Sequence, residues 1–324
     1  MIIVWRVLNA CNLACPFCAF DKRLALPHIA IDPQEVLRFI AILASMQQRS
    51  GERILMSWLG GEPFLWEPLE YLTLMARAQS LAVSATTNGT ALGSAKLRRH
   101  LCAAYSELTV SIDGFSDFHD PMRGWDGSFT KLRQWVSLLA QDIRTSGSPL
   151  KLRANVVLMH QNLSTFAALC EELATWGIAE ITFNQLGGRD RPEFYPVHRL
   201  TRSDADALSM MLPGLQRRLA DSGAVVVGGP DYLARIHAST QNQPLAVNDC
   251  GPGEQFLFID ETGLISPCSF TSADYSVPVR DIATVDDLAA LPTRFRAMRS
   301  TRRAFACDDC LSTQVSGKFA CKVA

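Results

Sequence analysis

The segment Cys11-Asn12-Leu13-Ala14-Cys15-Pro16-Phe17-Cys18 places three thiols within eight residues, directly after the strand-like run 2–8. Three closely spaced thiolates can hold three irons of a 4Fe–4S cluster and leave the fourth iron without a protein ligand. Structural zinc is the simpler alternative, but it normally takes four ligands, and the nearest histidine is His28. A distant ligand could still complete a zinc site. The segment therefore indicates a metal site at the end of a first strand.

Strand-like and helical segments alternate on both sides of this point. Helical periodicity marks 95–105, 129–144 and 165–176, and a first helix begins with Asp32 as its cap, Pro33 in its first turn and Glu35 completing a capping box. Strand–helix repetition implies parallel strands joined by right-handed crossovers. We therefore predict an α/β fold, a partial (βα)6 TIM-like barrel. Its strands are expected at 2–8, 53–59, 81–87, 108–112, 150–158 and 180–184.

The pattern changes after residue 184. A loop carrying Gly187 and Arg189 leads to a helical segment near 203–222, and then to short strands at 256–259 and 264–266 with Gly263 in the turn between them. Five of the ten cysteines lie between residues 250 and 321. We predict a barrel over residues 1–200, a connecting helical region over 201–245, and a small C-terminal α+β domain over 246–324.

Composition excludes several classes of protein. The chain has 324 residues, 48% hydrophobic and 19% charged, with a net charge of -1, which favours a globular protein and no nucleic-acid partner. The longest apolar run, 39–44, is too short to span a bilayer, so no membrane association is expected. The lipoprotein-like Leu8-Asn9-Ala10-Cys11 lacks a preceding apolar region. We therefore expect a cytoplasmic protein whose cysteines serve metal or redox chemistry.

The cysteine spacing resembles the signature of the radical S-adenosylmethionine (radical SAM) enzymes, including the aromatic residue before the third cysteine. Gly60-Gly61-Glu62-Pro63 follows the second expected strand and resembles the motif that receives the amino group of SAM. The resemblance covers roughly residues 1–185 and implies a 4Fe–4S cluster on Cys11, Cys15 and Cys18. The positions that it assigns to SAM binding are Phe17, Gly60, Gly61, Glu62, Pro63, Thr87, Asn88, Ser111, Asp113, Arg153 and Asn155.

The C-terminal cysteines resemble the SPASM/twitch appendages that carry auxiliary iron–sulfur clusters in part of this superfamily. That resemblance implies one auxiliary 4Fe–4S cluster, because a full SPASM domain needs more cysteines. Its ligands are expected among Cys250, Cys268, Cys307, Cys310 and Cys321, and which of the last three complete the site stays open. A zinc knot held by four cysteines is the alternative.

The resemblance implies an oxidoreductase-like enzyme. It would cleave SAM reductively, remove hydrogen from an unactivated carbon with the 5′-deoxyadenosyl radical, and take its electron from an external donor such as flavodoxin or ferredoxin. The favoured outcome is oxidative modification of a ribosomal peptide precursor. A small-molecule dehydrogenase or related enzyme of natural-product or cofactor biosynthesis is the alternative, and a non-enzymatic zinc-binding module is a third reading. The candidate catalytic residues are Asp113, His119 and Arg189.

Overall fold

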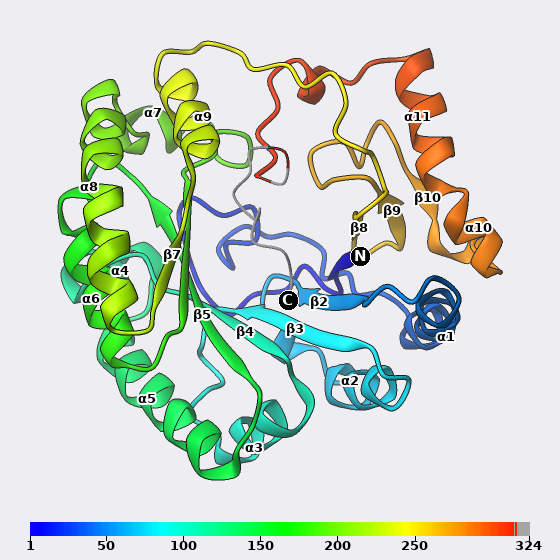
Figure 1. The fold of residues 1–324 in the computed structure, drawn as a ribbon, viewed down its shortest axis with the longest axis horizontal. Helices are drawn as coiled ribbons and strands as arrows, with labels where there is room; N and C mark the ends of the chain where they lie inside the picture. The colour runs from blue at the N-terminus through cyan, green and yellow to red at the C-terminus, as the bar shows by residue number, and fades with distance from the viewer. Residues whose placement is uncertain (314, 316–324) are drawn as a thin grey trace.

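One ten-stranded sheet organises the protein. The computed structural model describes residues 1–313 and 315. The sheet has the order β10-β9-β8-β1-β2-β3-β4-β5-β6-β7, in which β8 and β1 to β7 run parallel and β8, β9 and β10 pair antiparallel (Figure 1). The strands are β1 (Ile2–Arg6), β2 (Leu55–Leu59), β3 (Ala82–Thr87), β4 (Glu107–Ser111), β5 (Lys151–Leu158), β6 (Glu180–Gln185), β7 (Val225–Val227), β8 (Phe256–Ile259), β9 (Leu264–Ser266) and β10 (Val277–Pro278).

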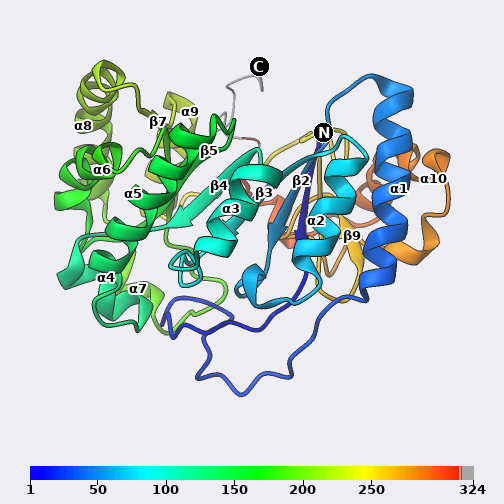
Figure 2. The same cartoon turned by 90° about the horizontal axis from the view of Figure 1, so that it is seen from below.

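Helices that connect the parallel strands lie along one side of the curved sheet (Figures 1 and 2). In chain order, the helices of the described residues are α1 (Pro33–Ser50), α2 (Leu69–Ala78), α3 (Ala95–Ala104), α4 (Ser116–Arg123), α5 (Ser128–Ser146), α6 (Phe166–Thr175), α7 (Tyr195–His198), α8 (Arg202–Asp221), α9 (Pro230–Thr240), α10 (Val285–Ala289) and α11 (Leu291–Thr301), of which the last two follow β10. Short 3₁₀ segments cover Pro63–Leu65, Leu163–Thr165, Val279–Asp281 and Phe305–Cys307. Among the described residues, no helix is both long and apolar enough to cross a membrane.

The strands alternate between two faces, as the period of a pleated strand requires. Trp5 and Trp58 are fully buried against the helices. The Trp5 ring meets Phe39 of α1 edge to face at 5.6 Å, and the Trp58 indole N–H donates to the Thr73 hydroxyl of α2 at 2.9 Å. The intervening residues, such as Val4 and Ser57, face the concave side and are only half-buried. The concave side is therefore the less covered face of the sheet at these strands.

Helix α1 begins as predicted in two respects and differs in a third. Asp32 accepts a hydrogen bond from the Gln34 backbone N–H at 2.9 Å, and Pro33 occupies the first turn. The expected capping box is wrong, because the Glu35 carboxylate pairs with Arg38 at 2.9 Å. Arg38 in turn donates to the Val279 carbonyl at 2.7 Å, so Glu35 helps α1 to hold the C-terminal segment.

The C-terminal segment continues the main sheet. Strand β8 pairs in parallel with β1, with Ile2 opposite Phe256, and α10 packs on α1. Gly263 turns β8 into β9 with a φ of 83°, a conformation that favours glycine.

The α/β fold with a parallel sheet is confirmed, and the six strands predicted for the barrel all form. Strand β7 was not expected and lies within the region predicted as a helical connection. The domain boundaries at residues 200 and 245 remain predictions.

Candidate functional site

The cysteine loop lies between β1 and α1, beyond the carboxyl ends of the first strands (Figure 2). Cys15 is buried, while Cys11 and Cys18 are half-buried. Backbone N–H groups of Leu13 and Phe20 donate to the sulfurs of Cys11 and Cys18 at 3.5 and 3.4 Å. Burial raises the pKa of all three thiols, that of Cys15 to about 11. Because the ligating form is the thiolate, these sulfurs need a nearby cation to deprotonate at neutral pH.

The Gly60-Gly61-Glu62-Pro63 loop is docked onto the cysteine loop by its backbone. The Gly61 N–H donates to the Leu8 carbonyl and the Glu62 N–H to the Ala10 carbonyl, each at 2.9 Å. A Cβ at Gly61 would stand 2.2 Å from the Ala10 carbonyl oxygen. Glycine is therefore required for this close approach.

Glu62 is fully buried, and both of its carboxylate oxygens already accept hydrogen bonds. The Thr87 hydroxyl donates to one oxygen and the Asn88 backbone N–H to the other, each at 2.7 Å. Burial raises the Glu62 pKa to about 7, although these hydrogen bonds and one from the Phe64 N–H oppose the rise. Glu62 thus ties the glycine loop to the end of β3. The predicted contact with the SAM ammonium stays a prediction.

Asn88 connects β3 to the cysteine loop. Its side-chain amide donates to the Asn12 side-chain oxygen at 2.9 Å and lies 3.8 Å from the Cys11 sulfur. The Asn12 amide donates to the Thr90 hydroxyl at 3.0 Å. Sequence reasoning did not single out Asn12 or Thr90, although Asn12 lies inside the cysteine motif. A cavity of about 290 Å³ opens here, lined by Asn12, Leu13, Lys22, Thr90, Gly124 and Trp125.

Asp113 and His119, which follow β4, are brought together in a fully buried cluster. The Asp113 N–H donates to His119 Nδ1 at 3.0 Å, and the Asp113 carboxylate pairs with Arg123 at 2.7 Å. Burial lowers the His119 pKa well below its usual range, so its imidazole is neutral. Burial raises the Asp113 pKa, which the Arg123 guanidinium opposes. Both side chains are enclosed by the protein. A catalytic role for Asp113 or His119 stays a prediction.

Ser111 and Asn155 occupy opposed positions on β4 and β5. The Asn155 side-chain oxygen accepts from the Thr182 hydroxyl at 2.9 Å and from the Asn184 amide at 3.0 Å, which holds it on the concave face. Arg153 lies nearer the amino ends of the strands, where it pairs with Glu107 at 2.9 Å and with Glu180. The SAM contact predicted for Arg153 stays a prediction, but its guanidinium already has two partners.

Arg189 links the loop after β6 to the C-terminal segment. Its guanidinium donates to the Ser269 carbonyl at 3.4 Å and lies 5.6 Å from the centre of the Phe270 ring. Phe17 of the cysteine loop lies 6.3 Å from Phe194, centre to centre. The loop after β6 therefore touches both cysteine-bearing regions.

The C-terminal cysteines are gathered by two backbone segments that lie side by side. The Cys310 N–H donates to the Leu245 carbonyl at 2.9 Å, and the Val247 N–H to the Cys307 carbonyl at 3.3 Å. Burial raises the Cys250 pKa, and Cys268, Cys310 and Cys307 lie near enough to raise it further. Cys321 lies outside the described residues. Within the described ranges, no three Cys, His, Asp or Glu side chains already stand as ligands of one metal ion.

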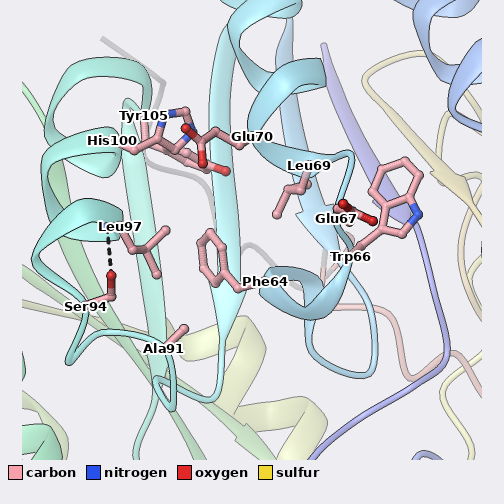
Figure 3. A pocket seen from close by; sticks show the side chains of 10 residues that line it. All are labelled: Phe64, Trp66, Glu67, Leu69, Glu70, Ala91, Ser94, Leu97, His100 and Tyr105. Atoms are coloured by element: carbon pink, nitrogen blue, oxygen red, sulfur yellow. Dashed lines mark hydrogen bonds between the residues drawn. The ribbon is translucent and has the colours of Figure 1, made fainter.

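A second cavity, of about 270 Å³, lies between α2 and α3 on the helical side of the sheet (Figure 3). Its lining includes Phe64, Glu70, His100 and Tyr105. None of the residues predicted for SAM or metal binding lines it.

The fold and this arrangement of cysteines define a class of enzyme. The sequence model of the Radical SAM superfamily matches residues 5–173. The chain belongs to that superfamily and is a radical SAM enzyme, whose fold implies a 4Fe–4S cluster and SAM.

Several known proteins are similar to this chain in sequence or in fold. The AdoMet-dependent heme synthase of Oleidesulfovibrio alaskensis is 24% identical over 294 residues, 84% of this chain and 70% of that protein. The mycofactocin maturase MftC of Mycolicibacterium smegmatis is 25% identical over 323 residues, 95% of this chain and 74% of that protein. Streptococcus suis SuiB bound to S-adenosylmethionine has a TM-score of 0.69 at 15% identity, covering 95% of this chain and 71% of that one. SuiB bound to the precursor peptide SuiA has a TM-score of 0.64, and the match covers 89% of this chain and 65% of that chain.

The N-terminal loop fits the cluster that this fold implies. It presents three thiols, two of which accept backbone N–H donors, and a buried guanidinium lies beside the third. Hydrogen bonds and nearby positive charge are the usual stabilisers of ligating thiolates. Hydrogen bonds also connect the glycine loop and the end of β3 to this cysteine loop.

Proposed function

We propose that Cys11, Cys15 and Cys18 hold the 4Fe–4S cluster, and that the loops after β2, β3 and β4 bind SAM beside it. These groups, once bound, supply a 5′-deoxyadenosyl radical that removes hydrogen from an unactivated carbon. The observation that carries the proposal is the hydrogen-bonded connection from the Glu62 carboxylate through Asn88 to Cys11. It joins the proposed SAM loop, the end of β3 and a proposed cluster ligand by direct polar contacts.

The remaining candidate residues take proposed roles by position. Ser111 and Asn155 lie on the concave face and are proposed to contact the ribose or carboxylate of SAM. Asp113 and His119, which are connected to Cys15 through Arg123, are proposed to take part in catalysis. Arg189, in the loop between the two cysteine regions, is proposed to contact the substrate.

We further propose an auxiliary 4Fe–4S cluster in the C-terminal region. What supports it is the proximity of Cys250, Cys268, Cys307 and Cys310, which affect one another electrostatically although they come from three separate segments. An auxiliary cluster can accept an electron from a substrate or ligate it, so oxidation of the substrate is the proposed outcome. The first electron is proposed to come from a flavodoxin or ferredoxin.

The proposed substrate is a ribosomal peptide precursor. Support comes from the similarity over 95% of the chain to the maturase MftC and from the shared fold with SuiB, which has been solved with a precursor peptide. A small-molecule substrate is the second candidate, favoured by the similarity over 84% of the chain to an AdoMet-dependent heme synthase.

The test has two stages. Protein reconstituted without oxygen is assayed for iron, sulfide and zinc, and a chain that holds zinc without sulfide would overturn both cluster assignments. Loaded enzyme is then incubated with SAM, reductant and short peptides encoded near its gene, and mass spectrometry follows the loss of hydrogen. A Cys307→Ala/Cys310→Ala variant should still cleave SAM without substrate and form no product. Product from the folded variant would contradict an oxidising role for the second cluster.

A further inference from the structure

The buried guanidinium of Arg123 lies between a carboxylate and a sulfur. One of its ends pairs with the Asp113 carboxylate at 2.7 Å, and the other lies 3.9 Å from the sulfur of Cys15. The Arg123 side chain is only 10% exposed and that of Asp113 is fully buried. The group therefore acts through a medium with little water, where charges interact strongly.

Several contacts fix Arg123 at this place. The Asp113 carboxylate accepts a hydrogen bond from the Val157 backbone N–H at 2.9 Å, and the backbone N–H of Asp113 donates to the His119 ring. The Arg123 carbonyl accepts from the Ala14 N–H at 3.3 Å. Gly124 ends α4 in the left-handed conformation, and a Cβ there would stand 2.9 Å from the Cβ of Ala14. The end of α4 is thus pressed against the cysteine loop.

The Asp113 carboxylate and the Phe17 ring, whose centre lies 5.4 Å from Arg123 Cζ, account for only part of the surroundings of the guanidinium. The second end of the guanidinium faces a sulfur, and Arg123 Nε is buried without a hydrogen-bond partner among the described residues. Moving a guanidinium out of water costs free energy unless nearby groups interact favourably with its charge. The geometry accordingly favours an electrostatic role toward Cys15.

We propose that Arg123 is a tuning residue, which raises the reduction potential of the N-terminal cluster by holding a positive charge against the Cys15 sulfur, while Asp113 sets how strongly that charge acts. A positive charge stabilises the more reduced, more negative state of a cluster, and hydrogen bonds to its sulfurs act in the same direction. The inference rests on the proposed assignment of the cluster to Cys11, Cys15 and Cys18.

The two partners must then shift the potential in opposite directions. Arg123→Met removes the positive charge beside the Cys15 sulfur, so the potential falls. Asp113→Asn removes the opposing charge, so the potential rises. Arg123→Lys keeps the charge and remains close to the wild type. Loss of packing alone would weaken the fold in both single variants and would not give shifts of opposite sign.

The experiment is a redox titration of the reconstituted full chain, followed by electron paramagnetic resonance of the cluster whose signal changes when SAM is added. Iron and sulfide are counted for every variant. At a fixed potential, Arg123→Met should lower the ratio of reduced to oxidised cluster at least about tenfold, equal to ~59 mV for a one-electron couple. Asp113→Asn should raise that ratio. If Arg123→Met takes up no cluster, Arg123→Gln is the neutral variant, and the Asp113→Asn arm gives its sign independently.

Equal potentials in loaded variants, or shifts of the same sign, would overturn the inference while leaving the cluster assignment intact. Failure of the assignment itself looks different, because Cys15→Ala would then retain a SAM-responsive signal.

Discussion

Gly61→Ala tests whether the glycine loop must touch the cysteine loop. The new methyl group would stand 2.2 Å from the Ala10 carbonyl oxygen and 2.6 Å from that of Asn9, and both are backbone atoms with little freedom to move. An ordinary contact needs more than 3.4 Å, so the loop must retreat by roughly 1 Å.

That displacement breaks two hydrogen bonds of 2.9 Å, from Gly61 to Leu8 and from Glu62 to Ala10. Each buried N–H left without a partner costs about 1–3 kcal/mol, so the free energy of unfolding should fall by about 2–6 kcal/mol. The Glu62 carboxylate would also leave Thr87 and Asn88, so SAM binding to the loaded enzyme should weaken at least about tenfold.

Urea unfolding of the cluster-free protein, followed by circular dichroism, measures the first effect, and equilibrium dialysis of SAM measures the second. Gly187→Ala is the matched control, because a Cβ at Gly187 meets nothing within 4 Å. The reasoning is refuted if Gly61→Ala unfolds within about 0.5 kcal/mol of the control and binds SAM equally well.

Three further predictions follow from other contacts. Thr73→Val should lower stability by about 1–3 kcal/mol in urea unfolding, because the Trp58 indole and the Tyr105 hydroxyl lose their shared partner; Thr73→Ser keeps that hydroxyl, and equal stability of the two variants would contradict the assignment. The Glu62 pKa is about 7 in the folded cluster-free protein and 4.5 in the unfolded chain. Between these pH values the folded protein therefore binds one proton more than the unfolded chain. Its stabilising effect is complete below pH 4.5 and is lost as pH rises through 7, by about 3 kcal/mol; Glu62→Gln should remove this slope from urea midpoints measured at several pH values, and an unchanged slope would count against it. Replacing Cys11, Cys15 and Cys18 by Ala should lower iron from roughly eight to roughly four atoms per chain, whereas Cys102→Ala on α3 should lower none; equal losses would refute the ligand assignment.

Local patterns were enough to predict the barrel strands and several of the helices. Runs of β-branched residues and the cap at Asp32 depend on neighbours in sequence, so they survive folding unchanged. Strand β7 was not predicted, because Val225–Val227 is too short to show the alternation of apolar and polar residues that is typical of a strand. It is held by pairing with β6 and by the Gln216 amide, which donates to the Val226 and Gly228 carbonyls. None of those partners is adjacent in sequence.

The site shows the same division. Cysteine spacing and the glycine motif are local signals, and they marked the loops that the fold brings together. The contact of Arg123 with Cys15 joins residues 108 positions apart, and the sequence carried no sign of its geometry. The sequence also could not show that Thr87 and Asn88 already satisfy both oxygens of Glu62.

The pairing of β8 with β1 has a consequence for synthesis on the ribosome. Strand β1 must wait for residues 256–259 before its second edge is covered, although its other partner, β2, is synthesised much earlier. An uncovered strand edge is a template for pairing with other chains. Nascent chains that stall before β8 should therefore aggregate through β1, and the emergence of β8, rather than completion of the barrel helices, should mark the point at which the nascent protein is protected from such pairing.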